Sequence, residues 1–209
     1  AADLPDYEWI GLGREGGSRG EFMAVFYRKA RFEPLAYDHF WLSDTPDVIA
    51  SSTWGNRNRR MVTWVRFLDR QTKQEFLLWN THFDDQIQAA REQAAKLVRE
   101  RVAALDTKLP LILTGDFNAA GGTNAAYKIL TAGGFFADTW MTARERKGEG
   151  LNTSNGFQAI GRNGVRIDWI LTRGEVVADS TEIVTFSRNG QFPSDHFPVV
   201  ARMRFAAAK

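Results

Sequence analysis

Four short clusters of polar residues in this sequence could carry acid–base or metal chemistry. The clusters are Asn80-Thr81-His82, Gly115-Asp116-Phe117-Asn118, Asp168 within an apolar run, and Ser194-Asp195-His196. The first two directly follow apolar runs, and the last closely precedes one. Proteins of the α/β class display functional side chains at the carboxyl ends of buried strands. The pattern therefore predicts one site assembled from distant parts of the chain.

Asp168 carries the strongest of these signals, because it lies between Ile167 and Trp169. An ionised carboxylate in such surroundings is costly unless it is paired. His196 is a natural partner, which the carboxylate would orient and keep cationic. Taken singly, the clusters also fit structural roles, since Asp-Phe-Asn after a strand commonly forms an Asx turn. Taken together, they favour a functional site.

The apolar patterning predicts an α/β domain with many strands and few helices. Apolar residues recur every three or four positions from Gln86 to Leu105, which predicts a long amphipathic helix. A shorter helix is expected over Asn124–Thr131, and Arg144–Gly150 is expected to be a polar loop. The wholly apolar Leu109–Thr114 is typical of a strand buried on both faces. Further strands are expected in Phe22–Arg28, Phe32–Trp41, Arg60–Asp69, Glu75–His82, Val165–Leu171, Glu182–Phe186 and Val199–Phe205.

Length and composition exclude several classes of protein. The 209 residues are 44% apolar and 25% charged, as in an ordinary globular protein, and no apolar run is long enough to span a bilayer. Because the chain has no cysteine, disulfides, zinc–thiolate sites and a thiol nucleophile are excluded. The net charge of +2 gives no whole-chain signature of a nucleic-acid binder.

Four ordered motifs resemble those of the endonuclease/exonuclease/phosphatase superfamily, over essentially the whole chain. They are THFDD at Thr81–Asp85, LTGDFNA at Leu113–Ala119, RIDWIL at Arg166–Leu171 and SDHFPVVA at Ser194–Ala201. The segments around Gly13-Arg14 and Gly20-Glu21 look like a bacterial branch of that superfamily. The resemblance implies a four-layer α/β/β/α sandwich of two mixed sheets, formed by a single domain over residues 1–209.

The resemblance also implies a role for each matching residue in metal-dependent hydrolysis of a phosphoester. Asp116 matches the aspartate that orients the attacking water, and Asn118 would point its amide at the same phosphate. His196, held by Asp168, would stabilise the phosphate, while His82 would contact the phosphate or assist the leaving group. The metal would be Mg²⁺, or Mn²⁺, with Asp195 on its side of the site, since Mg²⁺ prefers oxygen ligands.

One part of the family pattern has no counterpart in this sequence. The family opens with a strand–helix–strand unit whose Gln-Glu pair supplies the principal metal ligand, and this chain begins downstream of it. Glu8 does not align with that glutamate. We therefore expect an N-terminally truncated domain with weakened metal affinity and turnover.

The sequence leaves the substrate open. A basic patch at Arg57, Arg59 and Arg60 could meet a nucleic-acid backbone, although a solvated loop explains it slightly better. Asn155, ahead of the RIDWIL strand, is a candidate contact to a phosphate or sugar, which fits a small or lipid phosphoester. The alternative to an enzyme is a non-catalytic member of the superfamily that acts as a binding module. We expect a monomer without a membrane span, and lean toward an exported bacterial protein.

Overall fold

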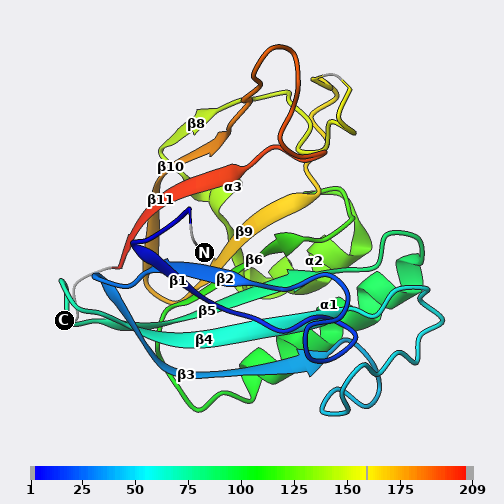
Figure 1. Cartoon of the computed structure of the whole chain (residues 1–209), viewed down its shortest axis with the longest axis vertical. Helices are drawn as coiled ribbons and strands as arrows, with labels where there is room; N and C mark the ends of the chain where they lie inside the picture. Colours follow the sequence, from blue (N-terminus) through cyan, green and yellow to red (C-terminus); the bar gives the residue numbers. More distant parts are fainter. Residues whose placement is uncertain (1–2, 159, 206–209) are drawn as a thin grey trace.

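A computed structural model describes residues 3–158 and 160–205 of the chain, so the outermost residues of the expected 1–209 domain lie outside the description. The central element is a six-stranded mixed sheet with the strand order β3-β4-β5-β6-β9-β7 (Figure 1). Its strands are β3 (Phe32–Trp41), β4 (Met61–Asp69), β5 (Glu75–His82), β6 (Leu111–Asp116), β7 (Ala137–Asp138) and β9 (Asp168–Arg173).

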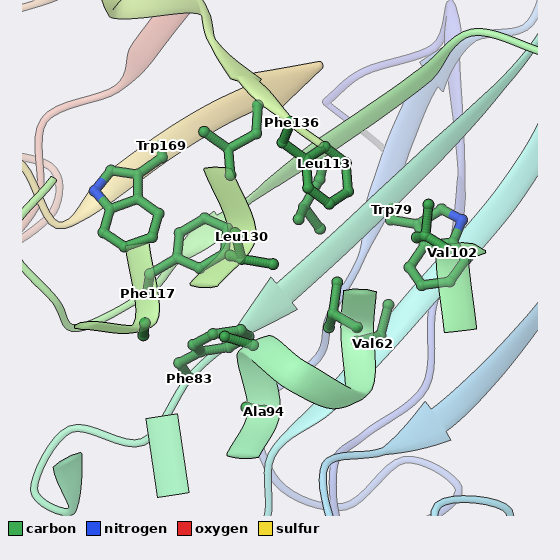
Figure 2. Packing of buried hydrophobic residues seen from close by; sticks show 14 of the residues in the cluster. Val62, Trp79, Phe83, Ala94, Val102, Leu113, Phe117, Leu130, Phe136 and Trp169 are labelled. Atoms are coloured by element: carbon green, nitrogen blue, oxygen red, sulfur yellow. The ribbon is translucent and has the colours of Figure 1, made fainter. Parts of the chain in front are cut away.

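Side chains alternate between the two faces of this sheet, as the twofold period of a strand requires. On one face Trp79, Leu113 and Trp169 pack in a core with the helices α1 (Gln88–Ala103) and α2 (Ala125–Thr131) (Figure 2). Helix α1 buries Ala94, Val98 and further residues at the predicted helical spacing. Asn124 caps α2 by accepting a hydrogen bond from the Ala126 amide.

The other face of the six-stranded sheet is covered by two smaller sheets. One pairs β1 (Tyr7–Ile10) with β2 (Val25–Arg28), and the other has the order β11-β10-β8. A second core joins both to the large sheet, with Val25 and Tyr27 from β2 and Met203 from β11 against Val65 and Phe67. The α/β sandwich of mixed sheets is thus confirmed, with its second layer of strands in two pieces. The strands of the three-stranded sheet are β8 (Glu145–Lys147), β10 (Val176–Ile183) and β11 (Val199–Phe205).

Most expected elements are present, and their differences have local causes. The predicted loop over Arg144–Gly150 contains the exposed strand β8, which pairs in parallel with β10 and carries no apolar signal. Strand β10 covers Val176–Ile183, earlier than the expected Glu182–Phe186. Pairing with β11 extends it back over the polar residues before Glu182. A short 3-10 helix, η1 (Ala132–Gly134), and helix α3 (Thr139–Thr142) complete the described elements. Within the described residues, no helix combines the length and apolar character needed to cross a membrane.

Candidate active site

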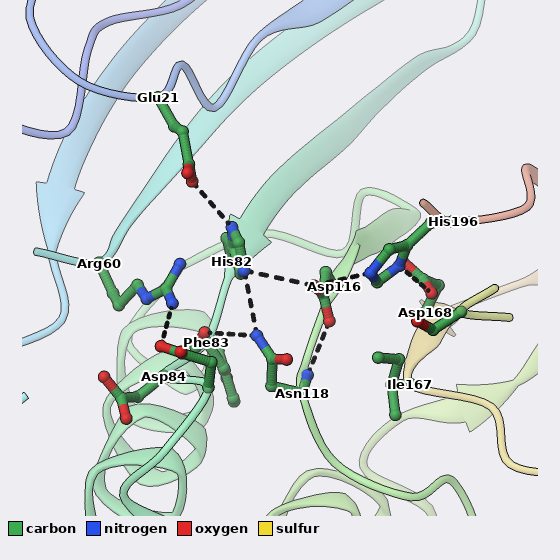
Figure 3. A network of polar contacts seen from close by, with 12 residues as sticks. Glu21, Arg60, His82, Phe83, Asp84, Asp116, Asn118, Ile167, Asp168 and His196 are labelled. Atoms are coloured by element: carbon green, nitrogen blue, oxygen red, sulfur yellow. Dashed lines mark hydrogen bonds and ion pairs between the residues drawn. The ribbon is translucent and has the colours of Figure 1, made fainter. Parts of the chain in front are cut away.

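The strand register of the large sheet places three predicted site residues side by side. His82 ends β5 opposite Asp116, which ends the parallel strand β6. Asp116 is in turn the register partner of Asp168 at the start of the antiparallel strand β9. Since neighbouring strands lie about 4.8 Å apart, the three side chains meet at one edge of the sheet (Figure 3). The sequence motifs are therefore brought together by backbone pairing.

A pocket of about 490 Å³ opens at this edge. Its wall contains all six residues to which the sequence assigned catalytic or metal roles: His82, Asp116, Asn118, Asp168, Asp195 and His196.

Buried aromatic side chains pack next to the site residues and fix their positions. Phe83, Phe117 and Trp169 directly follow His82, Asp116 and Asp168, and each is at most 1% exposed. The Phe117 ring stacks on Trp169 with centroids 4.2 Å apart and meets Phe83 edge-on at 4.9 Å. These contacts fix the backbone on which each polar side chain is carried.

His196 reaches the site from the loop before β11. Its Nδ1 lies 2.9 Å from Asp168 Oδ2, which is the pairing predicted from the sequence. This hydrogen bond, aided by the negative charges of Asp168, Asp116 and Asp195 and opposed by burial, raises the pKa of His196 to about 9. His196 is therefore a cation at neutral pH. Its Nε2 faces Asp116 Oδ2 at 3.9 Å.

Asp116 and Asn118 form the expected Asx turn as well as part of the site. The Asn118 amide donates to Asp116 Oδ1 at 2.8 Å, and Asn118 adopts φ +47°, which asparagine tolerates well. Burial would raise the pKa of Asp116, but the hydrogen bond and charge of His82, the Asn118 amide and the charge of His196 together lower it. Asp116 thus stays ionised, with His82 Nε2 3.2 Å from its Oδ2.

The opposite side of the pocket consists of residues that received no catalytic or metal role from the sequence. A tight loop returns Glu21 next to Arg14: their backbones are joined by a hydrogen bond, and Gly13 leaves no room for a Cβ beside Arg19. Glu21 Oε2 accepts from Arg14 Nη1 at 2.7 Å and lies 3.5 Å from His82 Nδ1. The paired Gly-Arg and Gly-Glu segments were the available signal. The five residues on this side are Arg14, Glu21, Asn58, Arg60 and Asp85.

Of the remaining candidates, Arg60 lines the pocket and Arg57, Asn155 and Glu8 lie elsewhere. Arg57 is exposed and does not line the pocket, whereas Arg60 is 4% exposed and lines it, so the solvated loop expected for this basic patch does not describe Arg60. Asn155 is buried behind the His196 loop, where its backbone amide donates to Asp195 O at 2.7 Å. Glu8 accepts a hydrogen bond from the Tyr27 hydroxyl, away from the pocket.

The pocket has the donor chemistry that a hard divalent cation needs. Ligand atoms of Asp116, Asp168 and His196 lie within 4.8 Å of one another, and Asp195 lines the same pocket. Carboxylate oxygens suit Mg²⁺ and Mn²⁺. Because His196 is cationic and bonded to Asp168, the carboxylates fit the ion better than the imidazole does.

Comparison with known proteins decides the family. The model of the Endonuclease/Exonuclease/phosphatase family matches residues 2–196. The chain belongs to this family. A solved family member from Bacteroides thetaiotaomicron is 33% identical with a TM-score of 0.92, covering 99% of this chain and 76% of that one. A mannosyl-6-phosphatase from the same organism is 32% identical with a TM-score of 0.89, covering 98% of this chain and 79% of that one.

Another relative matches over a shorter part of both chains. The uncharacterized protein L388 of Acanthamoeba polyphaga mimivirus is 30% identical over 122 residues, and the match covers 56% of the present chain. The match spans less than half, 44%, of that relative's own length.

Proposed function

We propose that this family member is a divalent-metal-dependent phosphoesterase that hydrolyses its substrate by direct attack of water. The observation that carries the proposal is the cationic His196, bonded to Asp168 and facing the ionised Asp116 across 3.9 Å. A cation and a carboxylate on facing sides of a pocket suit a reaction in which a phosphate gathers charge while water loses a proton.

Each residue has a role in that reaction. Water attacks phosphorus, the bond to the leaving oxygen breaks, and the leaving oxygen gains a proton. Asp116 orients the water and accepts its proton, while His196 donates a hydrogen bond to a non-bridging phosphate oxygen. The Asn118 amide contacts the same phosphate, and His82 lies where it can assist the leaving oxygen.

Asp195, with Asp168 beside it, would hold Mg²⁺ or Mn²⁺, which leaves Asp116 to act on the water. The bound ion would supply positive charge that offsets the charge growing on the phosphate.

We infer a small phosphomonoester rather than a nucleic acid as the substrate. The formal charge of the chain is only +2, and the exposed Arg57 stands apart from the pocket. A nucleic-acid backbone is bound by many cations that track its phosphates. The similarity to a mannosyl-6-phosphatase supports the small-substrate alternative.

Hydrolysis of p-nitrophenyl phosphate and bis-p-nitrophenyl phosphate with Mg²⁺ or Mn²⁺ tests the proposal. We expect turnover that EDTA abolishes and that His196→Ala lowers at least about 100-fold, since oxyanion-stabilising groups contribute that much. His39→Gln is the matched control, because His39 lies outside the pocket and bonds Thr63. Phosphate binding without any turnover would instead favour the binding-module alternative, and equal activity of both histidine variants would contradict the assigned chemistry.

A further inference from the structure

The side of the pocket across from Asp168 and His196 is built differently from the reaction side. We call Arg14, Glu21, Asn58, Arg60 and Asp85 the distal wall, all of which line the pocket. Figure 3 shows Glu21 and Arg60 on one side of His82, with Asp116, His196 and Asp168 on the other. A substrate whose phosphate meets His196 would therefore extend its leaving group toward the distal wall.

The distal wall carries no net charge. Arg14 Nη1 is 2.7 Å from Glu21 Oε2, and Arg60 Nη2 is 2.7 Å from Asp85 Oδ1, so each guanidinium already has a carboxylate. A second phosphate or an acidic group would meet these carboxylates as well as the arginines. The wall is therefore unsuited to an additional anion and suited to a neutral, polar group.

Several donors on this wall have no acceptor. The Nε and Nη1 atoms of Arg60, which is 4% exposed, and the Nε of Arg14 are buried without a hydrogen-bond partner among the described residues. Unpaired buried N–H groups are uncommon and costly, so a ligand oxygen that a small shift of these side chains brought within reach would relieve that cost. Asn58 lies next to Arg14, and its Oδ1 accepts a hydrogen bond from Arg14 Nη2 at 3.4 Å.

A hydroxyl group both donates and accepts hydrogen bonds. A row of hydroxyls matches a surface on which guanidinium and amide donors alternate with carboxylate acceptors. The pocket of about 490 Å³ also falls within the size range typical of small-molecule sites.

We propose that the distal wall binds the hydroxyl groups of the leaving alcohol, so that the preferred substrate is a phosphomonoester of a sugar or another polyol. This inference rests on the proposed phosphoesterase function. Arg60 and Asn58 act on specificity: they hold the leaving group and take no part in breaking the bond to phosphorus.

Calorimetric titration and hydrolysis assays together separate the two proposals, because titration reports binding where there is no turnover and KM reports the preference where there is turnover. Glucose 6-phosphate, phenyl phosphate and inorganic phosphate are titrated into the Mg²⁺-loaded protein, with enzymatic hydrolysis of the two esters measured in parallel. We expect glucose 6-phosphate to bind at least about tenfold more tightly than phenyl phosphate, since each hydrogen bond to a charged group contributes on that scale.

Two variants and one control locate the preference. Asn58→Ala and Arg60→Lys should each lower the preference for glucose 6-phosphate about tenfold, while leaving the affinity for inorganic phosphate within twofold. Arg19→Gln is the matched control, because Arg19 lies in the same loop as Arg14 but is exposed and does not line the pocket. Thermal unfolding verifies that Arg60→Lys is folded, and Asn58→Ala carries the test if it is not.

The outcomes distinguish the two proposals. Binding of all three compounds without a preference for the sugar ester, or a preference retained in Asn58→Ala, refutes the distal-wall subsite and leaves the phosphoesterase proposal standing. Failure of all three compounds to bind, together with no hydrolysis, refutes the proposed function and the subsite with it. Loss of the preference in Asn58→Ala but not in Arg19→Gln supports the subsite.

Discussion

The hydrogen bond between His196 Nδ1 and Asp168 links protonation at the site to the stability of the fold. In the folded chain the pKa of His196 is raised to about 9, mainly by this bond. In the unfolded chain a histidine titrates near its ordinary value of about 6.5. A group whose pKa is raised by folding contributes its stabilisation in full below the unfolded pKa, and loses it as pH rises through the folded one. The pair should therefore stabilise the fold at pH 6 and cease to do so above about pH 9.

Asp168→Asn tests this linkage, since asparagine keeps the shape of the side chain but removes its charge. In EDTA, we expect the free energy of unfolding of the variant to be about 1–3 kcal/mol below wild type at pH 6, with the difference shrinking toward pH 9.5. Denaturant titration at several pH values measures the difference between the two proteins, so that other titrating groups cancel. A difference that stays constant from pH 6 to 9.5 would contradict the linkage.

At the scale of elements, the site is positioned by the alternation of polar and aromatic residues at strand ends. His82, Asp116 and Asp168 are each followed by a buried aromatic residue, and His196 is followed by Phe197, which is 3% exposed. In each case the aromatic residue packs into a core while its polar neighbour stays at the pocket. Gly115 lets β6 approach β5 closely, since a Cβ there would lie 2.2 Å from Thr81 O.

Much of this arrangement is predictable from the sequence. The apolar period locates the long helix and the buried strands, and a carboxylate in the apolar run around Asp168 predicts the bond to His196. The Gly-Arg and Gly-Glu segments single out Arg14 and Glu21, but they do not predict the distal wall, because these residues join the pocket only through backbone pairing within their loop. Burial of Arg60 likewise depends on Asp85, which lies 25 residues further along the chain. Contacts between residues this far apart in the sequence cannot be predicted from the residues around each of them.

Thr153 couples the two elements that carry Asp168 and His196. Its hydroxyl oxygen accepts from the backbone amides of Ile167 at 2.9 Å and Asp168 at 3.2 Å, and its carbonyl accepts from the Phe197 amide. The side chain is fully buried. Thr153 thus fixes the start of β9 and the His196 loop relative to one another.

Thr153→Val removes the acceptor while keeping the shape, and leaves two backbone amides without a partner. We expect a loss of about 1–3 kcal/mol in the free energy of unfolding, and a fall in kcat larger than any change in KM because the Asp168–His196 geometry loosens. Thr181→Val is the matched control, since Thr181 is buried in β10, donates its hydroxyl to Val200 O of the neighbouring strand and does not line the pocket. If both variants lost activity equally, Thr153 would have a general packing role and no special link to the site.

At the scale of the whole molecule, the two layers of strands differ in how completely they are covered. Strands β4, β5 and β6 are paired on both sides and packed on both faces. The β1–β2 pair has two strands only, and its outward-facing Trp9 and Phe26 are 44% and 54% exposed. A cavity of about 420 Å³ lies between β2, the large sheet and β11, bordered by Phe26, Phe67 and Met203. Packing and pairing are therefore concentrated in the six-stranded sheet.

Amide hydrogen exchange should reproduce this division, because local opening costs least where few apolar contacts and strand pairings must be broken. We expect amides of β4, β5 and β6 to exchange only through global unfolding, and those of β1, β2 and β8 to exchange at least about 100-fold faster at the same pH. Glu21 lies in the loop that connects β1 to β2, while Asp116 and Asp168 lie on the large sheet. The pocket is therefore lined by both the fast-exchanging and the slow-exchanging layer. A ligand that bridges the distal wall and His196 should then slow exchange in β1 and β2 more than in β5. Equal protection of both layers without ligand would show that the second layer is as firmly held as the first, and that the distal wall is rigid before any substrate binds.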